Sequence, residues 1–128
     1  MEPENNISTT TDNGKNVAIV SYLSIIGWLI AYFAMHNDKK TELGSYHLRQ
    51  TLLFYIFSFG VYIVWSVIVT ALIFSLSLGL ASIALLLNWI IYIGLFVLWI
   101  IGFIAAINGE KKPIPLIGDK AQTMFKGI

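Results

Sequence analysis

From Gln50 to Gly109 the chain reads QTLLFYIFSFGVYIVWSVIVTALIFSLSLGLASIALLLNWIIYIGLFVLWIIGFIAAING. These sixty residues contain no Asp, Glu, Lys or Arg, and the nearest charges are Arg49 before them and Glu110 after them. A soluble domain gives its helices a polar face and its surface many charges, so it does not leave nearly half its length uncharged. A bilayer removes that need, because a helix crosses its hydrocarbon core of about 30 Å in roughly 20 residues. The stretch therefore predicts an integral membrane protein, with two crossings here joined by a short turn.

Composition agrees with this prediction and excludes several other classes. The 128 residues are 57% hydrophobic and 12% charged, and the net charge of +1 gives no reason to expect a nucleic-acid partner. There is no Cys, hence no disulfide framework and no thiolate metal site. Residues 1–16 carry three acidic residues and a single Lys, which is unlike a cleavable signal peptide. We expect them to form a disordered polar tail.

The apolar segments predict an all-α membrane protein with three transmembrane helices. The first crossing is expected over residues 17–35, which carry no charge and are long enough to span a bilayer. The other two are expected at about residues 51–74 and 80–107, with the turn at Ser75–Gly79. Residues 17–107 then form the transmembrane domain. Residues 108–128 form a C-terminal segment that Pro113 and Pro115 keep extended.

The distribution of basic residues predicts the orientation. With three crossings, the N-terminal tail and the Ser75–Gly79 turn share one side, which carries only Lys15. The other side carries seven basic residues: Lys39, Lys40, Arg49, Lys111, Lys112, Lys120 and Lys126. We expect a multi-pass protein of the inner (plasma) membrane, with its N-terminus outside and its C-terminal segment in the cytoplasm.

Small and polar residues within the apolar segments suggest how the helices pack. Gly27 with Ala31, and Gly102 with Ala106, stand four positions apart, a spacing that lets helices approach closely in lipid. Chance is the alternative, because Gly and Ala are common in such helices. Asn88 is read either as an interfacial amide beside Trp89, which we favour slightly, or as the donor or acceptor of an interhelical hydrogen bond.

The candidate site is a polar cluster at the cytoplasmic surface. His47 and Gln50 are three positions apart and share a helix face, whereas Arg49 points away from them, toward lipid phosphates. The extended tail has carbonyl groups that need donors, which His47 and Gln50 can supply. The cluster comprises His47, Arg49, Gln50, Asn108, Gly109, Pro113, Pro115 and Gly118. The alternative is that these are ordinary interfacial polar residues.

The sequence offers little for catalysis. Charged residues inside a membrane span mark ion paths and proton relays, and the predicted spans have none, which argues against a proton-coupled transporter. His36 and His47 are eleven positions apart without a suitable carboxylate cluster, so we predict no metal site. No nucleophile–base arrangement or phosphate-binding loop is present, so we predict neither an enzyme nor a cofactor.

Three short motifs carry a resemblance to a known family. They are Tyr22–Trp28 (YLSIIGW), Tyr46–Gln50 (YHLRQ), and Asn108–Glu110 (NGE) followed by Pro113–Lys120 (PIPLIGDK). Their order over residues 17–120 resembles the small bacterial membrane proteins related to the Tic translocon channel component of the chloroplast inner envelope. The resemblance implies a part in a protein-translocation pore.

Two functional hypotheses follow. Three apolar helices enclose no water-filled path alone, so a channel or translocation component is expected to act as a homo-oligomer. The alternative is a structural or accessory membrane subunit that binds a partner through its cytoplasmic face. In either case the expected partners are the lipid bilayer and further copies of the chain or another membrane protein.

Overall fold

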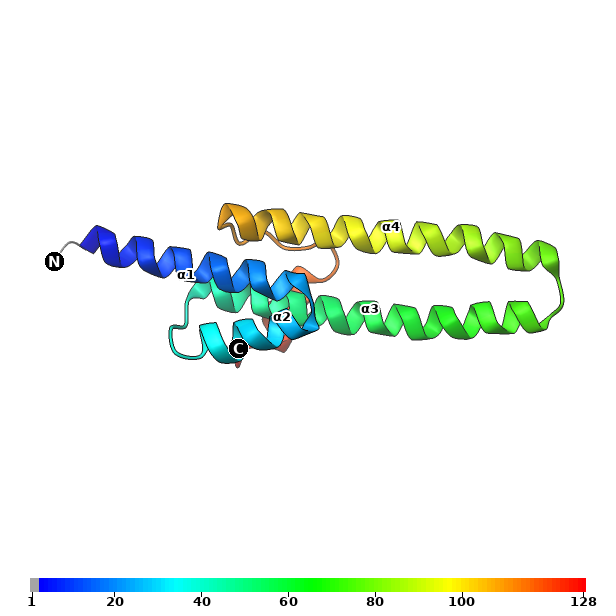
Figure 1. Ribbon diagram of the computed structural model, residues 1–128, viewed down its shortest axis with the longest axis horizontal. Helices are drawn as coiled ribbons and strands as arrows, with labels where there is room; N and C mark the ends of the chain where they lie inside the picture. Colours follow the sequence, from blue (N-terminus) through cyan, green and yellow to red (C-terminus); the bar gives the residue numbers. More distant parts are fainter. Residues whose placement is uncertain (1–2) are drawn as a thin grey trace.

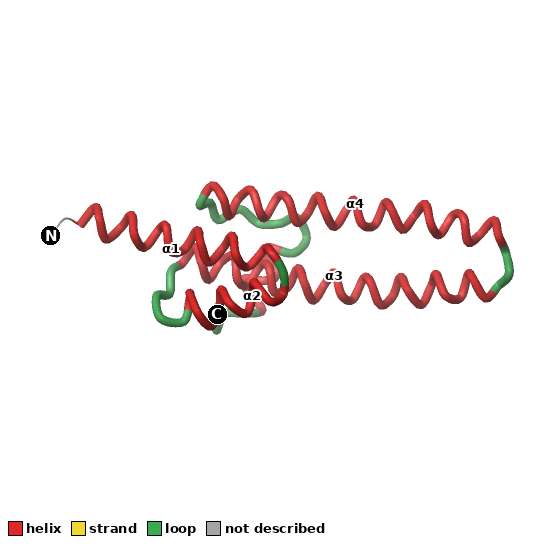
Figure 2. Tube along the Cα trace, viewed as in Figure 1, coloured by secondary structure: helices red, strands yellow, loops and turns green. Residues whose placement is uncertain are grey.

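The computed structural model describes the backbone of residues 3–128 and the side chains of residues 13–128, and this part of the chain contains helices and no strand. The helices are α1 (Pro3–Leu23), α2 (Ile25–Ile30), the π-helix η1 (Ala31–His36), α3 (Glu42–Phe74), α4 (Leu78–Asn108) and α5 (Gly118–Met124). Helices α3 and α4 lie side by side as a long hairpin, and the other elements gather around its open end (Figures 1 and 2). The start of α1 and the C-terminus lie at that end, away from the turn that joins α3 to α4 (Figure 1).

Local signals set the limits of the hairpin. The Thr41 hydroxyl caps α3 by accepting from the backbone N–H of Gly44 at 2.9 Å. Ser77 caps α4 by accepting from Leu80 N–H at 3.3 Å, and α4 ends at Gly109, whose φ of 70° suits glycine. Both helices are long and apolar enough to cross a membrane, as the sequence predicts. At 1.5 Å per residue, their 33 and 31 residues extend about 50 and 46 Å, which exceeds a hydrocarbon core of about 30 Å.

The sequence predicts that residues 17–35 form one membrane-spanning helix, but the structure divides them among α1, α2 and η1, so that prediction is wrong. Three membrane crossings are not confirmed. Helix α1 ends at Leu23, Ser24 is fully extended at φ −172° and ψ 173°, and the chain reverses into α2 (Figure 1). Ser24 Oγ then accepts from Gly27 N–H at 3.0 Å and starts the returning leg. Neither leg is long and apolar enough to span a bilayer. Residues 3–16, predicted as a disordered tail, form the first part of α1, and residues 1–2 of that tail lie outside the described residues.

The end of α1 is capped by side chains from the hairpin. The last four carbonyl groups of a helix have no partner inside the helix, and within a bilayer no water would meet them. The Tyr55 hydroxyl of α3 donates to the carbonyl oxygen of Ser21 at 2.7 Å, and Trp99 Nε1 of α4 donates to that of Tyr22 at 2.8 Å. These bonds hold the turn at Ser24 against both long helices.

The packed core lies at the open end of the hairpin, although Ala84, near the turn, is also buried. Its buried residues form two clusters, Ala18, Tyr22, Phe54, Ala106, Ile114 and Ile117 in one, and Val17, Trp28, Ala31 and Leu48 in the other. Toward the Ser75–Ser77 turn, α3 and α4 leave large apolar side chains exposed, as expected of a lipid-facing surface.

The four small residues predicted to pack helices lie at close contacts within the chain. A Cβ on Gly27 would lie 2.5 Å from the carbonyl oxygen of Val20, and one on Gly102 would lie 2.6 Å from Oη of Tyr22. Ala31 and Ala106 are fully buried. The Gly27 contact brings the two legs around Ser24 together.

Asn88 makes the interhelical hydrogen bond that we considered the less favoured alternative. Its Oδ1 accepts from Trp65 Nε1 at 2.9 Å and so joins α4 to α3. The bond lies in the outer part of the hairpin, beyond the packed core.

Candidate functional site

Three buried polar side chains form the centre of the site at the open end of the hairpin. Tyr22 of α1 and His47 and Gln50 of α3 are at most 1% exposed. Gln50 Nε2 donates to the Tyr22 hydroxyl at 2.8 Å, and that hydroxyl lies 3.1 Å from His47 Nδ1. His47 Nε2 lies 2.8 Å from the carbonyl oxygen of Glu110, which can only accept, so Nε2 carries the ring proton and Nδ1 of the neutral ring accepts from the Tyr22 hydroxyl. The network is satisfied with a neutral His47, and it ties α1, α3 and the C-terminal segment together.

Gln50 also holds the extended part of the C-terminal segment. Its Oε1 accepts from the Ile114 N–H at 2.9 Å, and its Nε2 lies 3.4 Å from the carbonyl oxygen of Lys112. Pro113 and Pro115 have no N–H to donate, so Ile114 supplies the donor in this stretch. The amide side chain of Gln50 therefore supplies the hydrogen bonds that a neighbouring strand would supply to this backbone. Ile114 is buried beside it.

The other residues of the predicted cluster lie around this network. Gly118 is buried, and a Cβ there would lie 2.6 Å from Gln50 Oε1 and 2.5 Å from the Cβ of Pro113. Gly109 ends α4 over the stem of Lys15, whose Cδ lies 3.2 Å from the position of an added Cβ. The side chains of Asn108 and Pro115 are exposed and take no part in the network.

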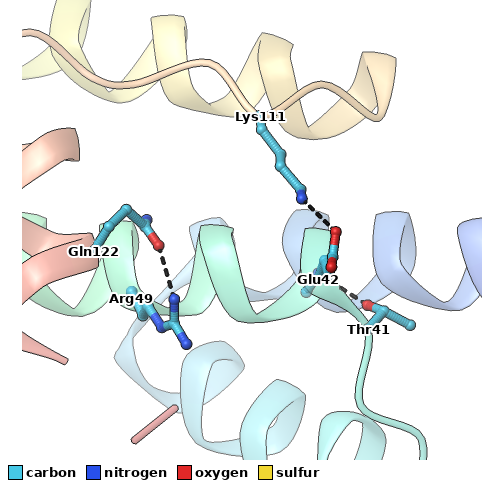
Figure 3. Close-up of polar contacts among 6 residues, drawn as sticks. Thr41, Glu42, Arg49, Lys111 and Gln122 are labelled. Atoms are coloured by element: carbon cyan, nitrogen blue, oxygen red, sulfur yellow. Dashed lines mark hydrogen bonds and ion pairs between the residues drawn. The ribbon is translucent and has the colours of Figure 1, made fainter. Parts of the chain in front are cut away.

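Arg49 lies apart from the buried network, as the helix spacing predicts, but it contacts protein. Its Nη1 donates to Gln122 Oε1 at 3.2 Å (Figure 3). Its Nη2 donates to the carbonyl oxygen of Lys126, also at 3.2 Å. Gln122 Nε2 in turn donates to the carbonyl oxygen of Tyr46 at 2.8 Å. These contacts fix α5, a helix that the sequence analysis did not predict, against the first turns of α3.

Beside Arg49 lies a polar pocket of about 530 Å³ between the start of α3, α5 and the segment after α4. Its lining comprises Lys40, Thr41, Glu42, Ser45, Tyr46, Arg49, Lys111 and Gln122. Lys111 Nζ and Glu42 Oε2 form an ion pair at 2.8 Å across one side of it (Figure 3). Three cations and one carboxylate make the pocket electropositive. Sequence reasoning missed it because Lys40 and Lys111 are far apart in the chain.

His36 forms a second polar contact that the sequence did not indicate. It is fully buried, and its Nε2 lies 3.2 Å from Ser45 Oγ and 3.4 Å from the carbonyl oxygen of Ile128, to which Ser45 Oγ also donates at 3.1 Å. Burial lowers the pKa of His36, the hydrogen bond to Ile128 opposes this shift, and the nearby charges of Lys40 and Arg49 lower the pKa further. His36 is therefore neutral at pH 7 and connects η1 to α3 and the end of the chain.

Comparison with known proteins places the chain in a family. A family model of the MamF/MmsF proteins, described as the magnetosome magnetite crystal formation protein family, matches residues 13–120. No curated protein and no solved structure matches the chain. The match includes residues 17–120, which suggested a relative of the Tic translocon channel component, so that assignment is wrong. Two of the sequence elements on which it rested, YHLRQ and PIPLIGDK, instead build the contact between α3 and the C-terminal segment. The chain belongs to the magnetosome magnetite crystal formation protein family.

Proposed function

We propose that this protein is an accessory subunit of the magnetosome membrane that supports magnetite crystal formation by binding a partner protein through its charged face. Helices α3 and α4 anchor it as a hairpin, and the Ser24 turn enters the membrane from one side without crossing it. The observation that carries the proposal is the segregation of charge. All fifteen Asp, Glu, Lys and Arg residues lie outside Gln50–Gly109, in segments that two crossings bring to one side.

This arrangement revises the orientation that we propose. With two crossings, all eight Lys and Arg residues share a side, and the Ser75–Ser77 turn has none. The bias of basic residues toward the cytoplasm therefore puts the N-terminus, the connector before α3 and the C-terminal segment in the cytoplasm. The opposite side of the membrane receives only the turn.

The turn is poorly suited to bind iron or a mineral directly. Iron in proteins is commonly bound by carboxylate and imidazole side chains. Residues 75–79 offer two Ser hydroxyls and neither of these groups. Asp38, Glu42, Glu110 and Asp119 are all exposed on the charged face. The chain is therefore better suited to affect the crystal by binding a partner protein on that face than by contacting the mineral directly as a template.

A channel is the weaker alternative. Two apolar helices enclose no water-filled path, and the part of the chain that the structure describes has no charged side chain in the hairpin between Gln50 and Gly109. A pore would need several copies arranged around a polar lining that α3 and α4 lack.

The pocket beside Arg49 is where we propose that the partner binds. Lys40 and Arg49 line it without an acidic partner among the described residues, whereas Lys111 is paired with Glu42. Guanidinium and ammonium groups favour carboxylates, so an acidic segment of the partner is the class that fits.

The proposal is tested in cells that make magnetite, by replacing the gene with variants and measuring crystals by electron microscopy. Deletion should alter crystal size or number, and the wild-type gene should restore them. Lys40→Glu reverses a charge in the pocket and should fail to restore them. Lys120→Glu makes the same change at an exposed residue of α5 outside the pocket and should restore them. Normal crystals after deletion, or equal restoration by both variants with equal protein levels, would contradict the proposal.

A further inference from the structure

Two turns of the packed end lie at nearly the same level along the hairpin. Hydrogen bonds from Tyr55 of α3 and Trp99 of α4 hold the Ser24 turn at the level of those two side chains. The segment between α4 and α5 runs back along the hairpin and reverses at about the same level (Figures 1 and 2). It contains a turn at residues 115–117, here called the Leu116 turn. Both turns therefore point toward the membrane that α3 and α4 cross.

Each of the two turns exposes large apolar side chains. At the Ser24 turn, Leu23, Ile25 and Ile26 are 63, 51 and 66% exposed. At the other turn, Leu116 is 81% exposed. An exposed apolar patch of this kind marks a surface that binds a partner or a membrane. These side chains continue the lipid-facing surface of the hairpin, so the lipid leaflet is the partner that fits them.

The backbone of Leu116 is strained, although its side chain packs on little of the protein. Its φ of 73° lies in the left-handed region, which is unfavourable for Leu and readily adopted by Gly or Asn. Strained residues of this kind persist where the surrounding structure or the function requires them. Because the side chain is exposed, packing within the chain does not explain a Leu at this position. Insertion of the side chain into lipid does explain it.

The level of the two turns makes this insertion shallow. Beyond Tyr55, α3 continues beside α4 from Ile56 to Phe74, which is about 28 Å at 1.5 Å per residue. This length is nearly the whole hydrocarbon core of about 30 Å, so the two turns lie at its edge, among the lipid headgroups. Amphipathic segments insert about 5–10 Å at this boundary. The chain therefore takes up more area in the leaflet that receives the turns than in the opposite leaflet, which α3 and α4 cross.

We propose that the Ser24 turn and the Leu116 turn form a wedge in the cytoplasmic leaflet, and that this wedge directs the protein to membrane that bulges toward the cytoplasm. Convex curvature opens gaps between the headgroups of that leaflet, and the apolar side chains of shallow segments fill such gaps. A flat or concave leaflet has fewer gaps, so the same side chains must displace packed lipid there. The wedge rests on the proposed function in requiring that α3 and α4 cross the membrane and that both turns face the cytoplasm.

Tethers pulled outward from giant vesicles test this preference, because the outer leaflet of a tether is strongly convex. The full chain, which has no Cys of its own, is reconstituted with a single cysteine and labelled from outside with a membrane-impermeant fluorescent maleimide. Gly127→Cys reports molecules whose cytoplasmic side faces outward, and Ser77→Cys reports molecules inserted the other way. Relative to a lipid dye, labelled Gly127→Cys should be enriched at least about twofold in the tether, whereas labelled Ser77→Cys should be depleted. Equal distribution of both labels between tether and vesicle would overturn the proposal.

A matched pair of variants separates the wedge from other effects of substitution. Ile26→Asn combined with Leu116→Asn removes an apolar side chain from each turn, and Asn tolerates the left-handed backbone at position 116. In the Gly127→Cys chain, this double variant should lose the enrichment in the tether. Leu76→Asn is the control, since Leu76 also has a positive φ, 60°, and is 91% exposed, but it lies in the turn between α3 and α4. It should keep the enrichment, and a double variant enriched as strongly as the wild type would overturn the proposal.

Counting labels per molecule distinguishes failure of the wedge from failure of the proposed function. A chain that carries both Asn13→Cys and Gly127→Cys should take two labels or none in intact vesicles, because the Ser24 turn does not cross the membrane. One label per molecule would mean that this segment crosses, which contradicts the proposed function. Two labels or none, without enrichment in the tether, would overturn the wedge alone.

Discussion

At the residue scale, His47 and Gln50 act as the partners of a segment that has no secondary structure to satisfy its backbone. They bond to the backbone of Glu110, Lys112 and Ile114 and, through the Tyr22 hydroxyl, to each other. Removing a buried partner leaves the other group unpaired, which costs about 1–3 kcal/mol. The network is therefore expected to determine how firmly the C-terminal segment is held.

Replacing both His47 and Gln50 with Ala should release residues 110–118, because their backbone groups lose these partners. Trypsin should then cut faster after Lys111, which is exposed, whereas Pro113 protects the bond after Lys112. Arg49→Ala should instead free α5 by removing its bonds to Gln122 and Lys126, so that cutting rises after Lys120 and Lys126. Asn108→Ala, at an exposed side chain outside the network, is the control and should match wild type. The same cutting pattern in both variants would show that the two contacts are not separate.

Acid should loosen the contact around His36. Its folded-state pKa is lowered, chiefly by burial, so the unfolded chain takes up the proton first as the pH falls. The contribution of the neutral, buried His36 to the free energy of unfolding is complete above the ordinary His pKa of about 6.5 and is lost as the pH falls below that value. Hydrogen exchange of residues 31–36 and 125–128 should be faster at pH 5.5 than at pH 7.5, after correction for the intrinsic rates. His36→Asn should remove this difference, and equal protection of the wild type at both pH values would refute the prediction.

At the element scale, the break at Ser24 is the main departure from what the sequence predicts. Residues 17–35 have the length and composition of a crossing, and hydrophobicity alone does not distinguish one helix from two short legs. The sequence feature that indicates the break is the combination of Ser24, which caps the second leg, and Gly27, which has no side chain. We interpreted Gly27 as packing between two helices, but it allows the second leg to fold back on the first.

The long hairpin and the contacts of the C-terminal segment were more accessible to sequence reasoning. The absence of charged residues between Gln50 and Gly109 predicts the two long apolar helices α3 and α4. Pro113 and Pro115 exclude a helix directly after Gly109. Helix α5 and the pocket beside Arg49 were not accessible, because they depend on contacts between residues about 70 positions apart, such as Lys111 with Glu42 and Arg49 with Gln122. No local sequence pattern predicts contacts between residues so far apart in the chain.

Gly27→Ala should destabilise the protein, because its Cβ would lie 2.5 Å from the carbonyl oxygen of Val20. A backbone atom cannot move aside as the end of a flexible side chain does, so we expect a loss on the order of 1–3 kcal/mol in the free energy of unfolding. Gly79→Ala is the matched control, since its Cβ meets nothing within 4 Å. Denaturant unfolding in detergent micelles compares the two variants. Equal stability of both would mean that the Gly27 contact does not hold the turn.

At the scale of the whole molecule, the fold divides into a polar, packed end and an apolar hairpin without a core of its own. In the arrangement that we propose, the Ser24 turn makes the number of crossings even and puts α1 and the C-terminal segment on one side of the membrane. Charge segregation, orientation and the proposed partner-binding face all depend on that count. With three crossings, Lys15 and the other seven basic residues would lie on opposite sides.

Site-directed labelling of single cysteines tests the number of crossings most directly, because the natural chain has none. Asn13→Cys, Ser77→Cys and Gly127→Cys would each be exposed to a membrane-impermeant maleimide in inside-out and right-side-out vesicles. Two crossings predict that Asn13→Cys and Gly127→Cys react in inside-out vesicles, whereas Ser77→Cys reacts in right-side-out vesicles. Reaction of Asn13→Cys together with Ser77→Cys, on the side opposite to Gly127→Cys, would contradict the account and restore the three-crossing arrangement.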